Sequence, residues 1–517
     1  MKQIDIAELS VKLTAIRNSM LAVEETFRGT ISQLHPNYRY SGLNFIRYLH
    51  LRQYKLKKYQ EALSNLGLSS FGHSERYTLS NLENTLYILN ALQGKEFTGL
   101  FPFAQHPVNY YKSKEILRDN TKRLFNFGDR PYNTSIMVTL PTEAGENPDL
   151  VNKLIASGMT IARINCSHDN PEIWKRMILF IKEASDKQGI PCQIYMDLAG
   201  PKLRTGPVHL GYRKNKKKVK KPIDFINIRE GDVLWLMKDL IKGENAKRKK
   251  DGTEKSPAKI SVSLPSIFGD VTAGDRIYFD DGAIAGTIEE IKKNHLTVRI
   301  RRTNRKGRLR QGKGINLPST HLSLPSLTSE DISNLPFIVE HADMVGYSFV
   351  RSAEDVQQLQ DELSKLKRPD IGIVLKVETK DAFDNFPNIL LQAMKSPSIG
   401  VMIARGDLAV ELGSQRISEV QEQLLWLCEA AMIPNIWATQ VLEKLAKEGL
   451  PTRAEISDAA MSARAECVML NKGPHILEAV NVLSDILARM KDHQHKKKGT
   501  LRALKVAKRF FRDQQPV

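Results

Sequence analysis

The sequence predicts an α/β fold, a TIM-type (β/α)8 barrel with an inserted small β-barrel domain and an N-terminal helical extension. From Ser135 onward, short β-rich runs alternate with helical stretches, which is typical of a parallel sheet with crossover helices. Eight such runs favour a closed barrel. The gap between the third and fourth runs is longer than a single helix needs, so it predicts the inserted β domain. The runs are 135–139, 160–164, 192–196, 343–347, 371–376, 399–403, 434–438 and 466–470.

The first 130 residues are predicted to form the helical extension. Apolar residues recur at three- and four-residue steps, which is the period of an amphipathic helix. The Gly67–Ser74 segment predicts a loop between helices. Residues 96–130, with Pro102 and Pro107, are interpreted as a connector. This region shows no catalytic constellation, so we expect it to serve in packing or oligomerisation. The first periodic residues are Leu9, Leu13, Ile16, Met20 and Val23.

The long gap is predicted to hold a β domain at residues 208–314. Turn signals at Gly231-Asp232, Gly274-Asp275 and Asp281-Gly282 separate short β-branched runs. Thr328 to Asp331 has the pattern of a capping box and predicts a helix start. The barrel then comprises 131–207 and 315–490, and residues 491–517 form a basic C-terminal tail.

The chain carries 77 basic and 58 acidic residues, a net charge of +19. Much of the excess lies in two blocks, Arg213–Lys259 and Lys491–Arg512, and such blocks are usually solvated loops or tails. In the second block, one helical face would be apolar. We expect it to dock on the protein's own acidic surface or to stay solvated; contact with nucleic acid or an anionic membrane is the alternative. The apolar face comprises Leu501, Leu504, Ala507 and Phe511, with Arg502, Lys505, Lys508 and Arg509 around it.

Compartment signals favour the cytoplasm. No run of about 20 apolar residues predicts a membrane span, and no signal peptide is evident. The cysteines lack a C-x-x-C pair, which argues against a disulfide framework and a zinc site. They are Cys166, Cys192, Cys428 and Cys467.

Polar residues follow the predicted strands, and the carboxyl ends of the strands assemble the active site of such a barrel. Glu378 and Asp407 end neighbouring strands, and two carboxylates offer oxygen ligands to a hard divalent cation such as Mg²⁺ or Mn²⁺. The strand-end segments are 163–168, 197–206, 376–378, 404–408 and 438–440.

Positive charge is predicted at the same end of the barrel. Arg163, Arg204 and Lys376 would surround a transferring phosphoryl group. Gly406, beside Asp407 at a predicted helix N-terminus, offers backbone N–H groups to a substrate carboxylate. Each feature alone is more often structural, but their joint placement at successive strand ends favours catalysis.

Several of these segments also carry a family resemblance. They are Ser157 through His168, Gly200-Pro201 with Arg204-Thr205-Gly206, Asp280-Asp281-Gly282, Gly314 through Pro318, Lys376 through Glu378, Ala404 through Leu408, Ala438-Thr439-Gln440 and Pro451 through Glu455. Because of these segments, residues from about 133 to 488 resemble pyruvate kinase. The resemblance implies a barrel with a mobile β lid and transfer of the phosphoryl group of phosphoenolpyruvate to ADP, which yields pyruvate and ATP. Apart from the resemblance, we expect a homo-oligomer.

The resemblance assigns the residues that bind and convert the substrate. Glu378 and Asp407 match the divalent-metal ligands, and Asp407 also belongs with Gly406 to the substrate site. Lys376 matches the lysine that neutralises the moving phosphoryl group. Arg163 matches a phosphate contact, and Thr439 the residue near the carbon that is protonated when enolpyruvate becomes pyruvate.

It also assigns a nucleotide side and a monovalent-cation site. His168, Asn165 and Arg204 fall on the nucleotide side, with Arg204 as a phosphate contact. Asn165 further belongs, with Ser167 and Asp197, to the site that holds K⁺ in the common enzyme.

Two positions of that cation site depart from the common pattern. Leu198 replaces a threonine that supplies an oxygen, and Lys202 occupies a position that is usually acidic. An ammonium on a flexible stem supplies the charge of the missing ion. The pair resembles the potassium-independent branch of the family, so we expect K⁺ not to be required.

Other departures keep alternative functions open. Thr139-Leu140-Pro141 lacks the family's usual glycine, and 471–475 replaces an acidic loop. The family's C-terminal domain has no counterpart, so regulation by sugar phosphates is expected to be absent. The alternatives are a related Mg²⁺-dependent barrel enzyme acting on another enolate or 2-oxo acid, and a non-catalytic binding protein.

Overall fold

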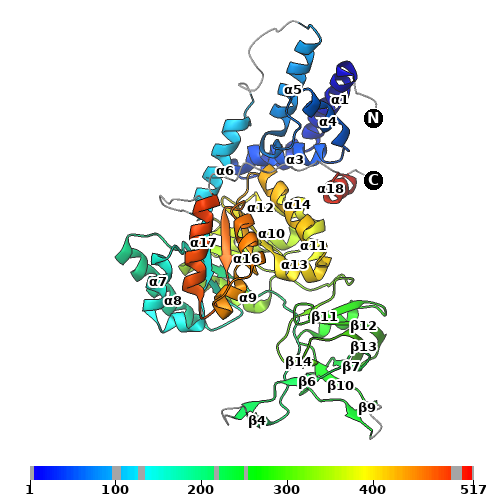
Figure 1. Ribbon diagram of the computed structural model, residues 1–517, viewed down its shortest axis with the longest axis vertical. Coiled ribbons are helices and arrows are strands. Elements are labelled where there is room, and N and C mark those ends of the chain that lie inside the picture. The colour runs from blue at the N-terminus through cyan, green and yellow to red at the C-terminus, as the bar shows by residue number, and fades with distance from the viewer. Residues whose placement is uncertain are drawn as a thin grey trace.

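The computed structural model describes residues 5–95, 106–125, 134–214, 220–249, 254–490 and 503–514. Eight parallel strands close into a barrel in the order β1-β2-β3-β16-β17-β18-β19-β20 (Figure 1). The strands are β1 (Ser135–Thr139), β2 (Ile161–Asn165), β3 (Gln193–Asp197), β16 (Met344–Tyr347), β17 (Gly372–Val377), β18 (Ile399–Ala404), β19 (Asn435–Ala438) and β20 (Cys467–Leu470). The predicted fold class is confirmed.

All eight strands begin and end within one residue of their predicted positions. Barrel strands are buried on both faces, so each appears in the sequence as a short, nearly continuous apolar run. Pairing of Ser135 with Cys467 closes the barrel between its first and last strands.

Helices surround the barrel and connect its strands. Thr328 caps α9 with a capping box, in which its hydroxyl accepts from Asp331 N and the Asp331 carboxylate accepts from Thr328 N, as predicted. The helices are α7 (Pro148–Ala156), α8 (Pro171–Gln188), α9 (Ser329–His341), α10 (Ala353–Lys365), α11 (Lys380–Asp384), α12 (Phe386–Ala393), α13 (Arg405–Leu412), α14 (Ile417–Ala430), α15 (Glu443–Glu448), α16 (Arg453–Ser462) and α17 (Ile476–Met490).

The helical extension stands at one end of the long axis of the molecule (Figure 1). Its apolar stripe packs into a core of its own, which includes Leu9, Leu13 and Met20. The Gly67–Ser74 segment is a loop before the short 3₁₀ helix at Glu75–Tyr77, as predicted. The helices are α1 (Ile6–Thr26), α2 (Arg28–Gln33), α3 (Arg39–Leu51), α4 (Lys57–Asn65) and α5 (Thr78–Leu92).

The interpretation of residues 96–130 as a connector is wrong for Tyr110–Phe125, which forms helix α6. The side that this helix buries carries the polar residues Ser113, Asn120 and Thr121, so the spacing of its apolar residues did not indicate a helix. Its last two residues, Leu124 and Phe125, are buried among the side chains that fill the barrel. A Cβ at Gly372 or Gly400 would overlap Leu124, so both glycines make room for it. The Leu124–Phe125 pair therefore plugs the barrel.

Residues from the inserted segment form a β domain at the other end of the long axis (Figure 1). A six-stranded sheet has the order β10-β7-β13-β12-β11-β15, and its core, which includes Ile226, Ile277 and Val298, is separate from that of the barrel. The strands are β4 (Tyr212–Lys214), β5 (Lys220–Pro222), β6 (Phe225–Asn227), β7 (Val233–Met237), β8 (Lys247–Arg248), β9 (Glu254–Ser256), β10 (Ala258–Ser261), β11 (Arg276–Phe279), β12 (Ile284–Ile291), β13 (His295–Arg302), β14 (Arg308–Arg310) and β15 (Ile315–Asn316).

The tail forms helix α18 (Lys505–Asp513), which docks on the protein itself. Leu504, Ala507 and Phe510 are buried, and Phe510 stacks on Phe27 with 5.6 Å between ring centroids. Arg509 pairs with Asp384 of α11 at 3.1 Å. Two residues of the predicted apolar face, Leu504 and Ala507, are therefore buried against the protein. Leu501 and Arg502 lie outside the described residues.

Within the described ranges, no helix is both long and apolar enough to cross a membrane. None of the four cysteines forms a disulfide within the described residues, and Cys192 is the only one of them that is not fully buried.

Candidate active site

A cavity of about 120 Å³ opens at the carboxyl ends of the barrel strands. Most predicted site residues line it, whereas Gly406 and His168 lie outside this lining. The lining comprises Arg163, Asn165, Ser167, Asp197, Leu198, Ala199, Lys202, Arg204, Ser348, Phe349, Lys376, Glu378, Met402, Ala404, Asp407, Thr439, Met469 and Asn471.

Lys376, at the end of β17, has three oxygen partners. Its Nζ lies 3.1 Å from Asp197 Oδ2, 3.1 Å from Glu378 Oε1 and 2.7 Å from Ser348 Oγ. Burial alone would lower the pKa of Lys376, but the two carboxylates outweigh it and raise the pKa above its ordinary value. The site therefore holds a permanent positive charge.

Arg163 and Asp197, on adjacent strands β2 and β3, form a buried ion pair. Asp197 also accepts from Tyr195 Oη at 3.0 Å, and Arg163 Nη1 donates to Thr139 Oγ1 at 2.9 Å. Burial would raise the pKa of Asp197, but Lys376 and Arg163 hold it below its ordinary value. Asp197 is thus an anionic anchor that orients both cations.

Glu378 and Asp407 supply the two predicted metal-ligand carboxylates. Glu378 Oε2 accepts from Phe349 N at 2.9 Å, and Asp407 Oδ1 lies 3.3 Å from Lys202 Nζ. Burial raises the pKa of Glu378 even though Lys376 opposes it, and the charge of Asp407 adds to the rise. Mutual destabilisation of two carboxylates is what a divalent cation relieves, so the donor set fits Mg²⁺ or Mn²⁺.

Within the described residues, no group of three or more His, Cys, Asp and Glu side chains is arranged to hold a metal ion. A site with only two protein carboxylates suits Mg²⁺, which keeps waters and takes substrate oxygens as its other ligands.

Thr439, after β19, adopts φ +66°, a backbone conformation that β-branched residues rarely adopt. Its Oγ1 accepts from Gly406 N at 2.7 Å. The Gly406 N–H, expected to face a substrate carboxylate, is therefore engaged with Thr439 in this structure. Arg405 fixes the same turn, because it donates to Thr439 O at 2.7 Å and pairs with Asp458 of α16.

The predicted nucleotide-side residues are more exposed. Arg204 Nη1 donates to Gly312 O of the β domain at 3.1 Å. Asn165 Oδ1 accepts from Ser167 N at 3.1 Å. Burial, together with the positive charges of Lys472 and Arg204, lowers the pKa of His168, so its imidazole is neutral at pH 7.

Ser348 and Phe349 belong to the site and were not predicted. Ser348 Oγ donates to Leu198 O at 2.6 Å and accepts from Lys376, and Phe349 N binds Glu378. They follow β16, so the strand-end rule that identified the other residues would have found them. A Ser-Phe pair carries no charge, however, and gave no chemical signal.

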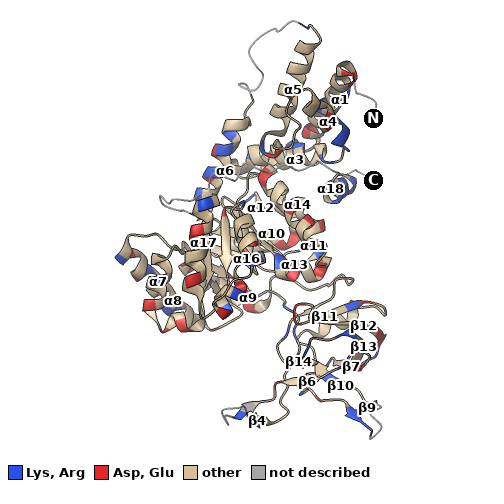
Figure 2. Cartoon of the chain, viewed as in Figure 1, with Lys and Arg blue, Asp and Glu red and all other residues tan. Residues whose placement is uncertain are grey.

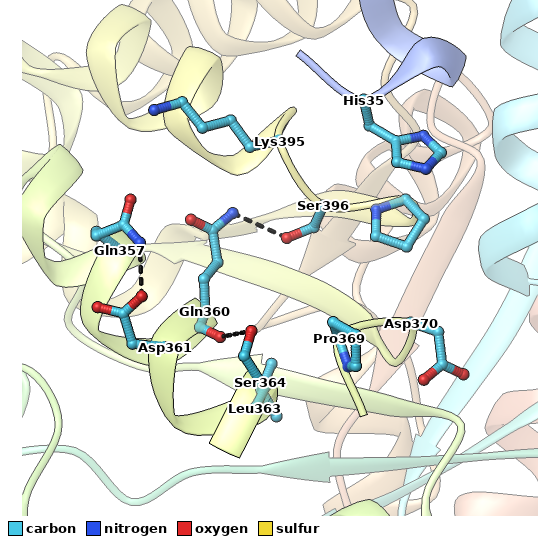
Figure 3. A pocket seen from close by; sticks show the side chains of 11 residues that line it. His35, Gln357, Gln360, Asp361, Leu363, Ser364, Pro369, Asp370, Lys395 and Ser396 are labelled. Carbon is cyan, nitrogen blue, oxygen red and sulfur yellow. Dashed lines mark hydrogen bonds between the residues drawn. The ribbon is translucent and has the colours of Figure 1, made fainter. Parts of the chain in front are cut away.

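A second hollow of about 390 Å³ lies between His35, α10 and the 395–397 loop (Figure 3). Several of its polar side chains form hydrogen bonds with one another. Gln360 Nε2 donates to Ser396 Oγ at 2.8 Å, and Gln357 Nε2 donates to Asp361 Oδ1 at 2.7 Å. It has no cluster of charged groups comparable with that around Lys376.

The fold and the cavity define a (β/α)8-barrel protein whose strand ends hold buried cations beside a pair of carboxylates. The family model of the pyruvate kinase barrel domain matches residues 132–474. The chain therefore belongs to the pyruvate kinase family.

Curated relatives agree with this assignment. The chain is 31% identical to a pyruvate kinase of Bacillus licheniformis over 71% of this chain and 58% of that protein. It is 31% identical to a pyruvate kinase of Dictyostelium discoideum over 68% of this chain and 65% of that protein. It is 32% identical to the pyruvate kinase PKLR of Rattus norvegicus over 67% and 58%, respectively. The chain thus spans less than two thirds of the length of these relatives.

Proposed function

We propose that the protein transfers the phosphoryl group of phosphoenolpyruvate to ADP, giving pyruvate and ATP. The observation that carries this proposal is the charged Lys376, held among Asp197, Glu378 and Ser348 at the carboxyl end of the barrel. A fixed, water-excluded ammonium stabilises the charge that develops on a phosphoryl group in flight.

The reaction breaks the bond between phosphorus and the enol oxygen and forms one to a terminal oxygen of ADP. Lys376 and Arg163 bind the phosphoryl oxygens, and Arg204 binds phosphate from the nucleotide side. The enolate then takes a proton at its terminal carbon. Thr439 lines the cavity and relays that proton from water.

Glu378 and Asp407 would hold the divalent cation, Mg²⁺ or Mn²⁺. When bound, the cation neutralises phosphate and carboxylate charge. Both carboxylates line the cavity with Lys376, which supports this assignment.

The test is steady-state turnover with phosphoenolpyruvate, ADP and Mg²⁺. Asp407→Ala and Glu378→Gln should each lower turnover by about 10³ or more, several kcal/mol of transition-state stabilisation. Asp485→Ala, at an exposed carboxylate on α17, is the matched control and should leave turnover unchanged. Turnover by Asp407→Ala within tenfold of the parent protein would overturn the assignment.

Independence from K⁺ is part of the proposal. The support for it is that Lys202 lines the cavity, where its Nζ lies 3.3 Å from Asp407 Oδ1, so a protein cation is available close to the predicted monovalent-cation site. Turnover in K⁺-free, tetraalkylammonium-balanced buffer should match that with K⁺. A stimulation of a hundredfold or more by K⁺ would show that Lys202 does not replace the ion.

A second candidate is a related barrel enzyme that acts on another enolate or 2-oxo acid, since the carboxylates and cations of this cavity would hold such a substrate equally well. Turnover across a panel of phosphorylated enols and 2-oxo acids separates the two candidates. A non-catalytic binding role is disfavoured because Lys376 and Asp407 are both retained.

We further propose a cytoplasmic homo-oligomer without sugar-phosphate regulation. Free cysteines suit a reducing compartment, and exposed apolar side chains on the helical extension, Val11 and Leu92, favour self-association. Sedimentation velocity and turnover with and without sugar phosphates test these points.

A further inference from the structure

The positive charge of the chain is concentrated in its β domain. Residues 208–314 contain 27 basic and 13 acidic residues, so they carry +14 of the total of +19. The rest of the chain, with 50 basic and 45 acidic residues, is close to neutral. Figure 2 shows basic residues along the hairpins that contain β4 and β9, in the part of the domain farthest from the helical extension.

Ion pairs within the domain leave many of its lysines uncompensated. Lys238, Lys247, Lys249, Lys255 and Lys293 are exposed, and none has an ion-pair partner among the described residues. Five of the domain's 13 acidic side chains are instead engaged with other cations, in the pairs Asp224–Arg310, Asp232–Arg248, Asp280–Lys313, Glu289–Arg299 and Glu290–Lys292. The excess charge is therefore available to an external polyanion.

Two aromatic rings lie among these lysines on the outer face of the six-stranded sheet. Trp235 of β7 and His295 of β13 are half-buried, and their ring centroids are 4.5 Å apart with 33° between the planes. Lys259 Nζ, on the neighbouring strand β10, lies 5.5 Å from the Trp235 ring centroid. At this distance the two rings stack on each other, so the pair forms an aromatic stack flanked by positive charge.

A shallow hollow of about 550 Å³ continues from this surface. Lys238, Phe268, Lys292 and Lys293 line it, and Lys238 Nζ lies 5.8 Å from the Phe268 ring centroid. Lys238 N donates to Asn294 O at 2.9 Å, which places the hollow next to His295. We call the surface formed by Trp235, Lys238, Phe268, Lys292, Lys293 and His295 the Trp235 face.

We propose that the Trp235 face binds single-stranded nucleic acid. Lysines contact the phosphates, and an unpaired base extends the Trp235–His295 stack, the combination of charge and stacking that non-sequence-specific single-strand binders use. A duplex keeps its bases stacked internally, so it would use the charge but not the rings. Anchoring in a membrane needs a continuous apolar surface, whereas the exposed apolar side chains of this region are Ile291 in the hollow and Leu240 near Lys238, and the two rings are half-buried. None of the six residues lines the active-site cavity, so the proposal is independent of the catalytic one.

The first experiment measures fluorescence anisotropy of a labelled 20-nucleotide single-stranded RNA with the full chain at several salt concentrations. Lys238→Glu/Lys293→Glu should weaken binding at least tenfold and reduce the salt slope by about 1.4 or more, because each lost phosphate contact contributes about 0.7. Lys182→Glu/Lys187→Glu on α8 makes the same change in net charge at exposed lysines far from the face and should bind as the parent does. Equal weakening by both variants would show non-specific attraction and overturn the proposal.

The second experiment tests stacking. Trp235→Leu keeps an apolar side chain but removes the ring, and it should weaken single-strand binding about tenfold while leaving the salt slope unchanged. Its thermal unfolding, followed by circular dichroism, serves as the folding control and should match that of the parent. Parent-like RNA binding by Trp235→Leu, tighter binding of a 20-base-pair duplex, or binding to phosphatidylserine vesicles in place of RNA would each overturn the proposal.

Discussion

Lys376 has three oxygen partners, and Asp197, Glu378 and Ser348 are all buried with it. Lys376→Met keeps most of the length of the side chain but removes its charge, so we expect turnover to fall by about 10³ while the fold persists. Coupled turnover and circular dichroism measure the two effects. Lys365→Met, at an exposed lysine on α10, should behave as the parent. A Lys376→Met variant within tenfold of the parent would exclude the neutralising role, since about 1.4 kcal/mol is too little for such a contact.

Glu411 on α13 makes stability depend on pH. Burial, with the nearby charges of Asp407 and Asp381, raises the pKa of Glu411 to about 7, although its carboxylate accepts from Asn316 Nδ2 at 2.9 Å. The folded chain therefore keeps this proton up to about pH 7, whereas the unfolded chain loses it near pH 4.5. The free energy of unfolding must fall as pH rises through this window, and the loss is complete above pH 7.

Glu411→Gln should remove that fall. We expect the difference in unfolding free energy between pH 5 and pH 8 to shrink by on the order of 2 kcal/mol, because partial contact with solvent limits the effect. Urea unfolding in metal-free buffer measures it, with Glu340→Gln at an exposed carboxylate as the control. An unchanged pH dependence in Glu411→Gln would mean that Glu411 is ionised in the folded protein throughout this range.

At this scale the sequence identified the charged residues of the site but not their geometry. Lys376, Glu378 and Asp407 were identified because a charged residue at the end of a predicted strand can be recognised from the sequence alone. That Gly406 N would bind Thr439, or that Arg405 would pair with Asp458, depends on contacts between distant segments, which no local pattern encodes.

Among the helices and strands, α6 gives the clearest prediction for stability. Leu124→Ala should open a cavity between Gly372 and Gly400 and lower the free energy of unfolding by about 2–5 kcal/mol. Leu179→Ala, at a side chain that is 51% exposed on α8, should change it by less than about 0.5 kcal/mol. Chemical denaturation measures both, and equal small effects would show that the plug does not stabilise the barrel.

The elements differ in how well the sequence predicts them, for a physical reason. Buried parallel strands need apolar residues at nearly every position, so their ends were accurate to one residue. Helix α6 contributes only its last turn to the barrel core, and its polar remainder resembles a connector. The buried side of α6 also includes Ser113, Asn120 and Thr121, so the helical period is present in burial but not in apolar residues.

At the scale of the molecule, we propose that the β domain at 208–314 is a lid that folds independently of the barrel. Its two connections run side by side, since Arg204 and Gly314 form an antiparallel bridge and Lys313 N donates to Thr205 Oγ1 at 2.9 Å. Joining Gly206 to Gly312 through a short Gly-Ser linker should therefore leave the barrel folded, because the two parts have separate cores.

The shortened chain should melt cooperatively but lose turnover by about 10³ or more, because Arg204 loses its β-domain neighbours and water enters the cavity. Thermal unfolding followed by circular dichroism and the coupled turnover assay test both parts. Loss of cooperative melting would show that the barrel depends on the β domain; full turnover would show that the lid is dispensable.

The plug at Leu124 and Phe125 also bears on how the chain folds as it is synthesised. The helix that carries the plug precedes Ser135, so it leaves the ribosome before any barrel strand, while the strand that closes the barrel, at Cys467, comes last. N-terminal parts of a chain fold first during synthesis, and unfinished sheets expose apolar surface and free edges. Each new strand would meet an apolar template already in place, so the growing barrel would have its interior partly covered long before its two edges join.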